Sequence, residues 1–339
     1  MHIQFFVPGL LWPGLQTEAP TRGLETPALA RLLGVAACEL AQGQGGEVAL
    51  LSAFGLPPAS SLAALRRLGE DGLQPPDEAS WLCADPVGLR FARDHLLLIE
   101  GSELDITVDE AAALIAGLNH EFGAIGRFEM ASPYRWYLGL AGGTPTTFAP
   151  LADVVGRPVA HFMPEGEGAA EWHRLINETQ VWLHHHPVNM AREAEGRQSI
   201  NSLWPWGAGD PPQAALAPAT VVVGDGSLLR GLCRSAGVTC GDQAIDALVA
   251  AGDGALVCVD EAADGARHLD LGAWQHALAS FDTEWLAPAL AAMRQGPVHR
   301  ISIHAPGDRA TLVADLVRPR LWPFWKRRVP LQAFIARQQ

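Results

Sequence analysis

The stretch TVVVGDGSLLRGLCRSAG, residues 220–237, decides the fold, because a short apolar strand runs directly into an amphipathic helix. The same alternation continues, with an apolar strand at 254–262, a helix at 270–295 and a strand at 299–305. Strands that alternate with helices form a parallel sheet with helices on both faces. The sequence therefore predicts an α/β fold.

The first part of the chain contributes to the same core. IQFFVPG (3–9) is typical of a short buried strand. A helix is predicted over 26–43, where Thr26 can cap the first turn and Pro27 suits its first position. A further helix is predicted over 61–72, before a proline-rich loop.

The pattern changes from Trp81 onward. Residues 81–101 indicate two strands around a polar turn, and residues 126–143 indicate a second strand pair. Between them lies a helix at 107–123, in which Thr107 and Glu110 have the spacing of a capping box. These elements predict a small α+β subdomain, of a size normal for such a unit.

Three consecutive histidines, His184 to His186, lie in a long helix predicted over 168–196 and interrupted by Pro187. Successive helical residues point about 100° apart, so the three rings cannot converge on one metal ion. Histidines also suit the negative end of the helix dipole. The run therefore indicates a polar helix end, and a strand follows over 200–209.

Composition excludes several classes of protein. The formal net charge of −13 argues against a nucleic-acid-binding protein, which usually carries a clustered basic face. No apolar run is long enough to span a membrane, and the N-terminus lacks the basic region of a signal peptide. Five scattered cysteines without metal-ligand or CxxC spacing indicate idle thiols in a reducing compartment, so a cytoplasmic location is expected.

Acidic residues follow several of the predicted strands, where sites form in parallel sheets. Asp225, Asp260 with Glu261, and Asp308 each come just after a strand. Metal-dependent phosphoryl transfer places carboxylates at such positions, although a solvated strand end has the same appearance. The chain contains no dinucleotide-binding GxGxxG after a strand, no Walker loop and no GxSxG nucleophile elbow.

The order of motifs resembles the archaeal-type cofactor-independent phosphoglycerate mutases of the alkaline phosphatase superfamily. ETPALARLLGVA (25–36), LINETQVWLHHHPVN (175–189) and SINSLWPWGAG (199–209) carry the resemblance over most of the chain. A bacterial branch known as regulatory proteins of the RpfE type has similar stretches. The most specific matches are the HPVN and WGAG signatures, which comprise His186, Pro187, Asn189, Trp206, Gly207 and Gly209.

The resemblance implies a phosphatase-like core formed by residues 1–75 and 165–339, with an inserted α+β subdomain at 76–164. It also implies an activity that uses two divalent metals and a serine nucleophile. This chain has Gly46 at the position of the serine and Pro8 at the position of the first metal-binding aspartate. Glycine carries no nucleophilic atom, so no catalytic residue is expected here.

The other metal-binding positions are only partly kept. Asp260 and Asp308 match acidic positions of the family, and Asp264 stands near a family histidine. Arg309 replaces a ligand histidine, and its guanidinium stays protonated and cannot bind a metal. The resemblance therefore leaves three vestigial metal-site positions, and no cofactor is expected.

Arginines at positions that resemble substrate-binding motifs of the family suggest recognition of an anion. Arg90 and Arg135 match two such motifs, Tyr134 replaces a family histidine, and Arg309 adds a third cation. A guanidinium binds anionic oxygens bidentately. A small anionic ligand between core and insert is one expectation, and ordinary surface arginines are the alternative.

Two functions remain open from the sequence. The first is a non-catalytic phosphoglycerate-mutase-like protein with a lost two-metal centre, in a binding or regulatory role. The second is an active diverged mutase or phosphohydrolase, which would require manganese or zinc.

The basic and aromatic residues of 317–334 leave a separate question. Such a segment could contact an anionic membrane surface or a protein partner. The alternative is that it packs on its own core through its aromatic side chains.

Overall fold

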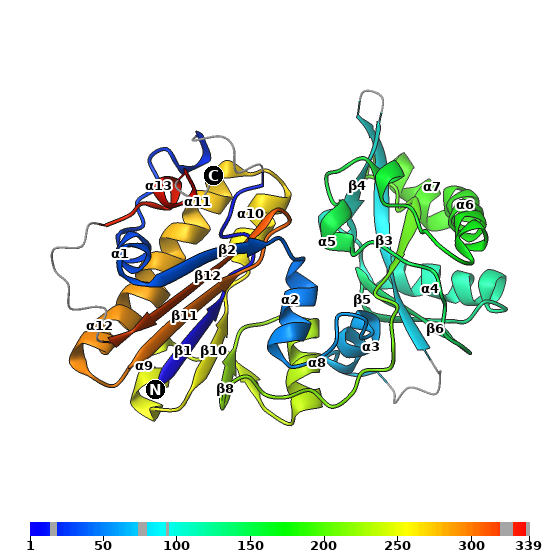
Figure 1. Ribbon diagram of the computed structural model, residues 1–339. Helices are drawn as coiled ribbons and strands as arrows, with labels where there is room; N and C mark the ends of the chain where they lie inside the picture. Colours follow the sequence, from blue (N-terminus) through cyan, green and yellow to red (C-terminus); the bar gives the residue numbers. More distant parts are fainter. Residues whose placement is uncertain (14–18, 74–79, 93–94, 319–327, 337–339) are drawn as a thin grey trace. The chain divides into compact units, whose positions relative to one another are not determined.

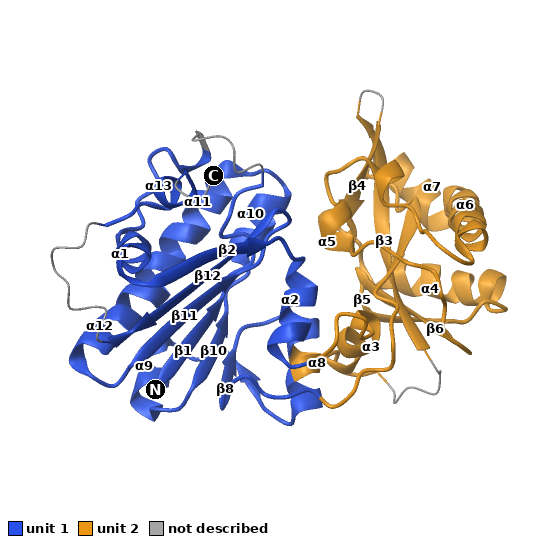
Figure 2. Cartoon of the chain, in the orientation of Figure 1, with its two compact units in different colours: residues 1–55, 215–229, 233–339 blue, residues 56–214, 230–232 orange. Residues whose placement is uncertain are grey.

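The computed structural model describes residues 1–13, 19–73, 80–92, 95–318 and 328–336. The chain forms two compact units (Figure 2). Unit 1 comprises residues 1–55, 215–229 and 233–339, and unit 2 comprises residues 56–214 and 230–232.

Unit 1 is built on a sheet with the strand order β2-β12-β11-β1-β10-β8-β9 (Figure 1). β1 lies between β10 and β11 and is parallel to both, whereas β12 is antiparallel to its neighbours. The strands are β1 His2–Phe6, β2 Ala37–Gln42, β8 Val221–Val223, β9 Cys240–Gly241, β10 Ala255–Cys258, β11 Arg300–Ala305 and β12 Ala310–Val317. The predicted α/β class and the parallel strand–helix alternation are confirmed.

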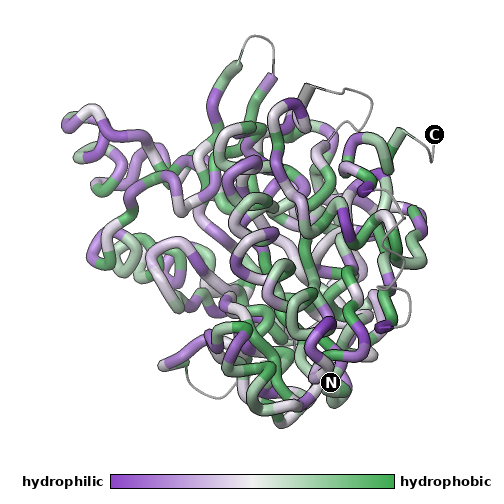
Figure 3. Tube along the Cα trace, turned by 90° about the vertical axis from the view of Figure 1, so that its left-hand side faces the viewer, coloured by the Kyte–Doolittle hydropathy of each residue, from purple (hydrophilic) through white to green (hydrophobic). Residues whose placement is uncertain are grey.

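Helices cover this sheet, and one face holds the main core. Alternate strand residues such as Ile3, Phe5 and Val257 pack there against apolar helix faces. Hydrophobic and hydrophilic stretches alternate along the helices in Figure 3, as expected for helices with one apolar face. Leu229 of the helix after β8 lies against Gly224. The helices are α1 Pro27–Val35, α2 Gly46–Ala53, α8 Ser227–Ala236, α9 Ile245–Ala251, α10 Glu261–Arg267, α11 Leu271–Ser280, the π-helix η4 Phe281–Leu286, α12 Ala287–Gln295 and α13 Leu331–Ala336, with a 3₁₀ turn η1 at Ala19–Thr21.

The single helix predicted over 26–43 is wrong in its second half. The chain becomes extended at Ala36, and β2 then pairs with β12 from Ala37 to Gln42. Pairing with a distant strand overrides the local helical preference of these residues.

The predicted Thr26 cap of the same helix is also absent. Thr26 makes no side-chain capping bond. Instead the Asp282 carboxylate accepts hydrogen bonds from Ala28 N (3.1 Å) and Leu29 N (2.7 Å). Asp282 lies in η4, so an acid more than 250 residues away in the chain satisfies the exposed N–H groups of α1.

Unit 2 contains an antiparallel sheet of the order β4-β3-β6-β5, in which β7 also pairs with the long strand β3. Apolar residues of this sheet pack against Leu114 and Leu118 of α4 and Leu183 of α6. The strands are β3 Ser80–Ala92, β4 His95–Glu100, β5 Arg127–Ser132, β6 Arg135–Leu140 and β7 Ser202–Trp206. The helices are α3 Leu62–Leu68, α4 Val108–Phe122, α5 Leu151–Val154, α6 Ala169–His185 and α7 Pro187–Ala194, with 3₁₀ turns η2 Gly101–Glu103 and η3 Val159–His161.

The capping box predicted at Thr107 and Glu110 is present at the start of α4. Unit 2 extends beyond residues 76–164 on both sides, and the predicted bounds of the insert stay a prediction. On the N-terminal side α3 joins it, where the Arg66 side chain bonds Asp85 of β3. On the C-terminal side β7 pairs with β3 from Ser202 to Trp206.

The described end of the basic-aromatic segment belongs to unit 1. Val329, Leu331 and Phe334 are buried in its core, and Val329 N donates to Ala30 O (2.9 Å). This agrees with the alternative that the segment packs on its own core. Residues 319–327, which hold most of its basic and aromatic side chains, lie outside the described residues, so membrane or partner contact there stays a prediction. In the part of the chain that the structure describes, no helix is both long and apolar enough to cross a membrane.

Candidate functional site

The candidate site of unit 1 lies where β1, β10 and β11 end. Val259 N donates to Phe6 O (2.9 Å) and Val7 N donates to His304 O (2.9 Å), which hold the three strand ends together. We call Pro8, Gly46, Asp260, His304 and Asp308 the strand-end site.

Gly46 and Pro8 lie side by side in this site. Gly46 is the first residue of α2, and a Cβ added to it would lie 3.6 Å from the Pro8 Cβ. The helix is brought there by its preceding loop, in which Gly43 packs on the Asp308 backbone and Gln44 N donates to Gly307 O (3.1 Å). The positions that the resemblance assigns to the nucleophile and a metal-binding aspartate are therefore adjacent.

Asp260 precedes α10 and is the carboxylate closest in sequence to the end of β10. Partial burial raises the pKa of Asp260, and the charges of Glu261, Asp264 and Asp225 raise it further. The acidic residues after β8 and β10 thus form one negative region, although the Asp260 side chain remains accessible to solvent.

The other predicted metal-site residues are exposed. Asp264 lies within α10 and forms an ion pair with Arg267 (3.4 Å). Asp308 and Arg309 lie in the turn between β11 and β12. Within unit 1, no three His, Cys, Asp or Glu ligand atoms of the described residues lie within 4.8 Å of one another. The donor set at these positions does not fit a two-metal centre.

His304 was not singled out from the sequence, although it is the second-last residue of the last parallel strand. Its ring lies edge-on to Phe6, with centroids 5.7 Å apart. Burial lowers the pKa of His304. The imidazole is therefore held in its neutral form near neutral pH.

We expect a measurable pH dependence of stability from this ring. Burial also lowers the pKa values of His2 and His186. Below a pH of about 6.5 the unfolded chain takes up protons that these folded histidines reject, so stability should fall as the solution is acidified. Urea unfolding between pH 8 and 5.5 measures this. A His304→Asn variant should lose less stability over that range than the natural protein, and parallel profiles would contradict the assignment.

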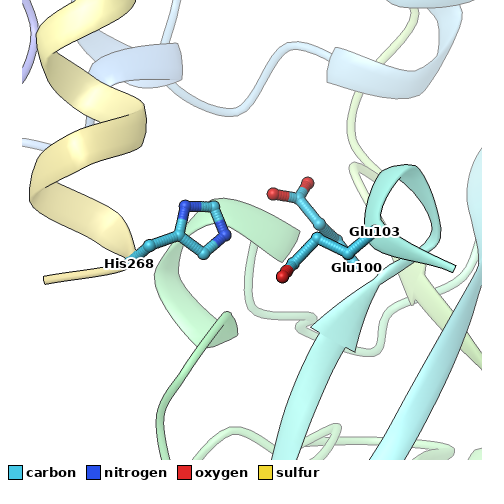
Figure 4. Close-up of side chains that lie close together, drawn as sticks. All are labelled: Glu100, Glu103 and His268. Carbon is cyan, nitrogen blue, oxygen red and sulfur yellow. The ribbon is translucent and has the colours of Figure 1, made fainter. Parts of the chain in front are cut away.

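The possible ligand residues drawn in Figure 4 belong to different units. His268 follows α10 in unit 1, and its Nδ1 lies 3.0 Å from Asp264 O. In unit 2, Glu100 ends β4 and Glu103 lies in η2.

The arginines predicted to bind an anion have different surroundings within unit 2. Arg90 is an exposed residue of β3. Arg135 binds Glu70 bidentately through Nε (2.6 Å) and Nη2 (3.0 Å), and Tyr137 Oη donates to the same carboxylate (2.8 Å). Burial by itself raises the pKa of Glu70, but the bonds from Arg135 and Tyr137 bring it below its ordinary value. Glu70 thus occupies one edge of the Arg135 guanidinium, and the anion-binding role stays a prediction.

The WGAG signature has a structural role in unit 2. Trp206 Nε1 donates to Asp85 (2.9 Å), which also binds Arg66. Gly207 has φ +77, and its carbonyl accepts from Ala63 N (2.9 Å). A Cβ on Gly209 would lie 2.4 Å from Ala59 O, so only glycine fits there.

The HPVN signature forms the break between α6 and α7. His186 Nδ1 accepts from Val188 N (3.2 Å), and Pro187 is the first residue of α7. The Asn189 side chain is fully buried and donates to Leu183 O (2.8 Å). His184 and His185 end α6, and His185 Nδ1 lies 2.8 Å from Val181 O.

Comparison with known proteins gives partial similarities. No protein-family model matches the chain. A 2,3-bisphosphoglycerate-independent phosphoglycerate mutase of Methanosarcina mazei is 34% identical over 173 residues, which cover 46% of this chain and 43% of that protein. A second such mutase, from Methanothermobacter thermautotrophicus, is 28% identical over 242 residues, covering 66% of this chain and 58% of that protein. The chain thus matches about half the length of these curated relatives.

One solved structure shares the fold over most of the chain. The PH0037 protein of Pyrococcus horikoshii aligns with a TM-score of 0.56 and covers 93% of this chain and 87% of its own. The sequences are 16% identical, so this similarity concerns the fold alone.

Proposed function

Since the chain is a phosphoglycerate-mutase-like protein, we propose that it is a non-catalytic relative of these enzymes with a binding or regulatory role. The observation that carries the proposal is the pairing of Gly46 with Pro8. Two apolar residues lie side by side at the positions where the resemblance places a nucleophile and a metal ligand.

The chemistry of phosphoryl transfer explains why this pairing matters. A covalent mechanism needs a nucleophilic side-chain atom, which Gly46 lacks. Two-metal catalysis needs carboxylate and imidazole donors arranged around both ions. Pro8 and Arg309 offer no donor, and the accessible carboxylates of Asp260, Asp264 and Asp308 are too dispersed to replace them.

The rest of the chain supports a retained role. The core of unit 1 is continuous around the strand-end site, and the HPVN and WGAG signatures of unit 2 keep their structural contacts. Residue types that catalysis would need are replaced, while the neighbouring residues Val7 and Val259 are buried in the core. A folded scaffold without the reactive groups is suited to binding.

Activity measurements test the proposal directly. The purified chain, supplied in turn with Mn²⁺, Zn²⁺ and Mg²⁺, should neither interconvert 3- and 2-phosphoglycerate nor hydrolyse p-nitrophenyl phosphate above the protein-free rate. The Methanosarcina mazei mutase serves as the positive control for the first reaction.

Two variants distinguish real turnover from contamination. Turnover that disappears in Asp260→Asn but persists in Asp210→Asn, an exposed acid of unit 2, would establish the alternative, an active diverged metal-dependent enzyme. Equilibrium dialysis should likewise find no stoichiometric Mn²⁺ or Zn²⁺. Binding that Asp260→Asn removes would contradict the proposal.

A further inference from the structure

β2 is an open edge of the sheet of unit 1. In the part of the chain that the structure describes, it pairs with β12 alone, from Ala37 to Gln42 (Figure 1). No backbone group of these six residues forms a hydrogen bond with any other described element. Every second residue of an edge strand directs its N–H and C=O groups away from the sheet, so β2 presents a row of unpaired backbone groups.

Other outer strands carry features that prevent further pairing. β9, at the opposite edge of the same sheet, is two residues long. In unit 2, β4 is bridged to segment 155–158, and β5 has a register shift between Met130 and Ser132. β2 has six residues, no proline, no lysine and an unbroken register against β12. Natural sheets usually protect such edges, so the open edge of β2 indicates that another strand pairs with it.

The two faces of β2 have different surroundings. Cys38 and Leu40 pack against the core of unit 1. Because side chains alternate along a strand, Ala37, Glu39 and Ala41 lie on the opposite face. Glu39 is exposed and is the one charged residue of β2. A partner strand must therefore accommodate a single acid on this open face.

We propose that β2 pairs antiparallel with β2 of a second copy of the chain, which joins the two sheets across a two-fold axis. A two-fold interface brings the same surface of both copies together, and an edge strand offers its own copy the N–H and C=O groups that it needs. The low charge of β2 permits such self-pairing. The proposal concerns unit 1 alone and does not depend on the function proposed above.

The charge of Glu39 selects the register of this pair. Residues that face each other in an antiparallel pair direct their backbone groups alike, so a two-fold pair places one residue opposite its own copy. With Glu39 at that position, two carboxylates would face each other, which is unfavourable. With Leu40 there, Glu39 faces Ala41 of the second copy, and Cys38 faces Gln42. With Cys38 there, Leu40 and Gln42 would lie outside the pairing of the two strands.

The natural protein gives the first test. Sedimentation equilibrium should detect a dimer, and amide hydrogen exchange in residues 37–42 should slow as the protein concentration rises through the dissociation constant. Exchange in β9, at the far edge of the sheet, should not change with concentration. A chain that stays monomeric up to about 1 mM, or exchange in 37–42 that is independent of concentration, would overturn the proposal.

Charge variants on the open face test the register. Ala41→Lys places a lysine opposite Glu39 at two symmetric positions of the dimer, and it should tighten the dissociation constant about two- to thirty-fold. Ala41→Glu places two acids opposite each other at the same positions and should weaken the dimer by a similar factor. Combining Glu39→Lys with Ala41→Glu restores opposite charges and should recover the tighter dimer.

Ala37 supplies the matched control. It lies on the same face of β2 but outside the paired residues 38–42, so Ala37→Lys and Ala37→Glu should leave the dissociation constant within about two-fold of the natural value. Circular dichroism and thermal unfolding show whether each variant keeps its fold. Equal dissociation constants for Ala41→Lys and Ala41→Glu, or equal effects at Ala37 and Ala41, would overturn the pairing.

Discussion

Replacing Asp85 with alanine should destabilise unit 2 by about 3–5 kcal/mol, because it leaves a buried arginine without its counter-ion. Asp85 is 1% exposed, and its carboxylate accepts bonds from Arg66 Nη1 (2.6 Å) and Nη2 (3.1 Å). It also accepts from Trp136 N (3.0 Å) and Trp206 Nε1 (2.9 Å). Urea unfolding followed by circular dichroism measures the loss, and hydrogen exchange should localise it to β3, β6 and β7.

Two comparisons make this result interpretable. Glu178→Ala breaks an exposed i,i+4 pair with Arg174 (3.8 Å) and should change stability by less than about 0.5 kcal/mol. The double variant Arg66→Met/Asp85→Leu removes both charges and should recover part of the loss, because no unpaired charge remains buried. If Asp85→Ala costs no more than Glu178→Ala, the buried ion pair is not the main support of this region.

Asn189→Ala should produce the second large loss, about 3 kcal/mol or more, since it leaves three buried backbone groups without partners. The Asn189 amide donates to Leu183 O (2.8 Å) and Ile200 O (2.7 Å), and its oxygen accepts from Ile200 N (2.8 Å). One side chain thus joins the end of α6 to the segment that precedes β7. Thermal and urea unfolding both report the change.

The neighbouring residue supplies a matched control. Met190 is 60% exposed in the same helix, and Met190→Ala should stay within about 0.5 kcal/mol of the natural protein. Asn189→Asp should be at least as damaging as Asn189→Ala, because a carboxylate cannot donate to the two carbonyl oxygens. Similar stabilities for Asn189→Ala and Met190→Ala would show that water replaces the amide.

The fold could be predicted where local signals and tertiary structure agree. The capping box of α4, the break at Pro187 and the strand–helix alternation after residue 220 all have local causes. Residues 37–42 could not be assigned correctly, because their strand exists through pairing with β12, far away in the chain. The Asp282 cap of α1 has the same explanation.

The candidate site was predictable only in part. The sequence placed Pro8, Gly46 and Asp260 at one site through the resemblance, and the structure shows Pro8 beside Gly46. It could not show that Glu70 binds Arg135, because this pair depends on how separate elements pack. His304 carried only a weak signal, its place near the end of a strand.

The central position of β1 has a consequence for synthesis on the ribosome. β1 pairs with β10 and β11, whose residues are made roughly 250 to 300 positions later. β1 therefore remains apolar and unpaired while segment 56–214 is synthesised, and that segment can fold before β1 does. Nascent chains of this protein should depend on chaperones that shield this apolar strand until β10 and β11 have been made.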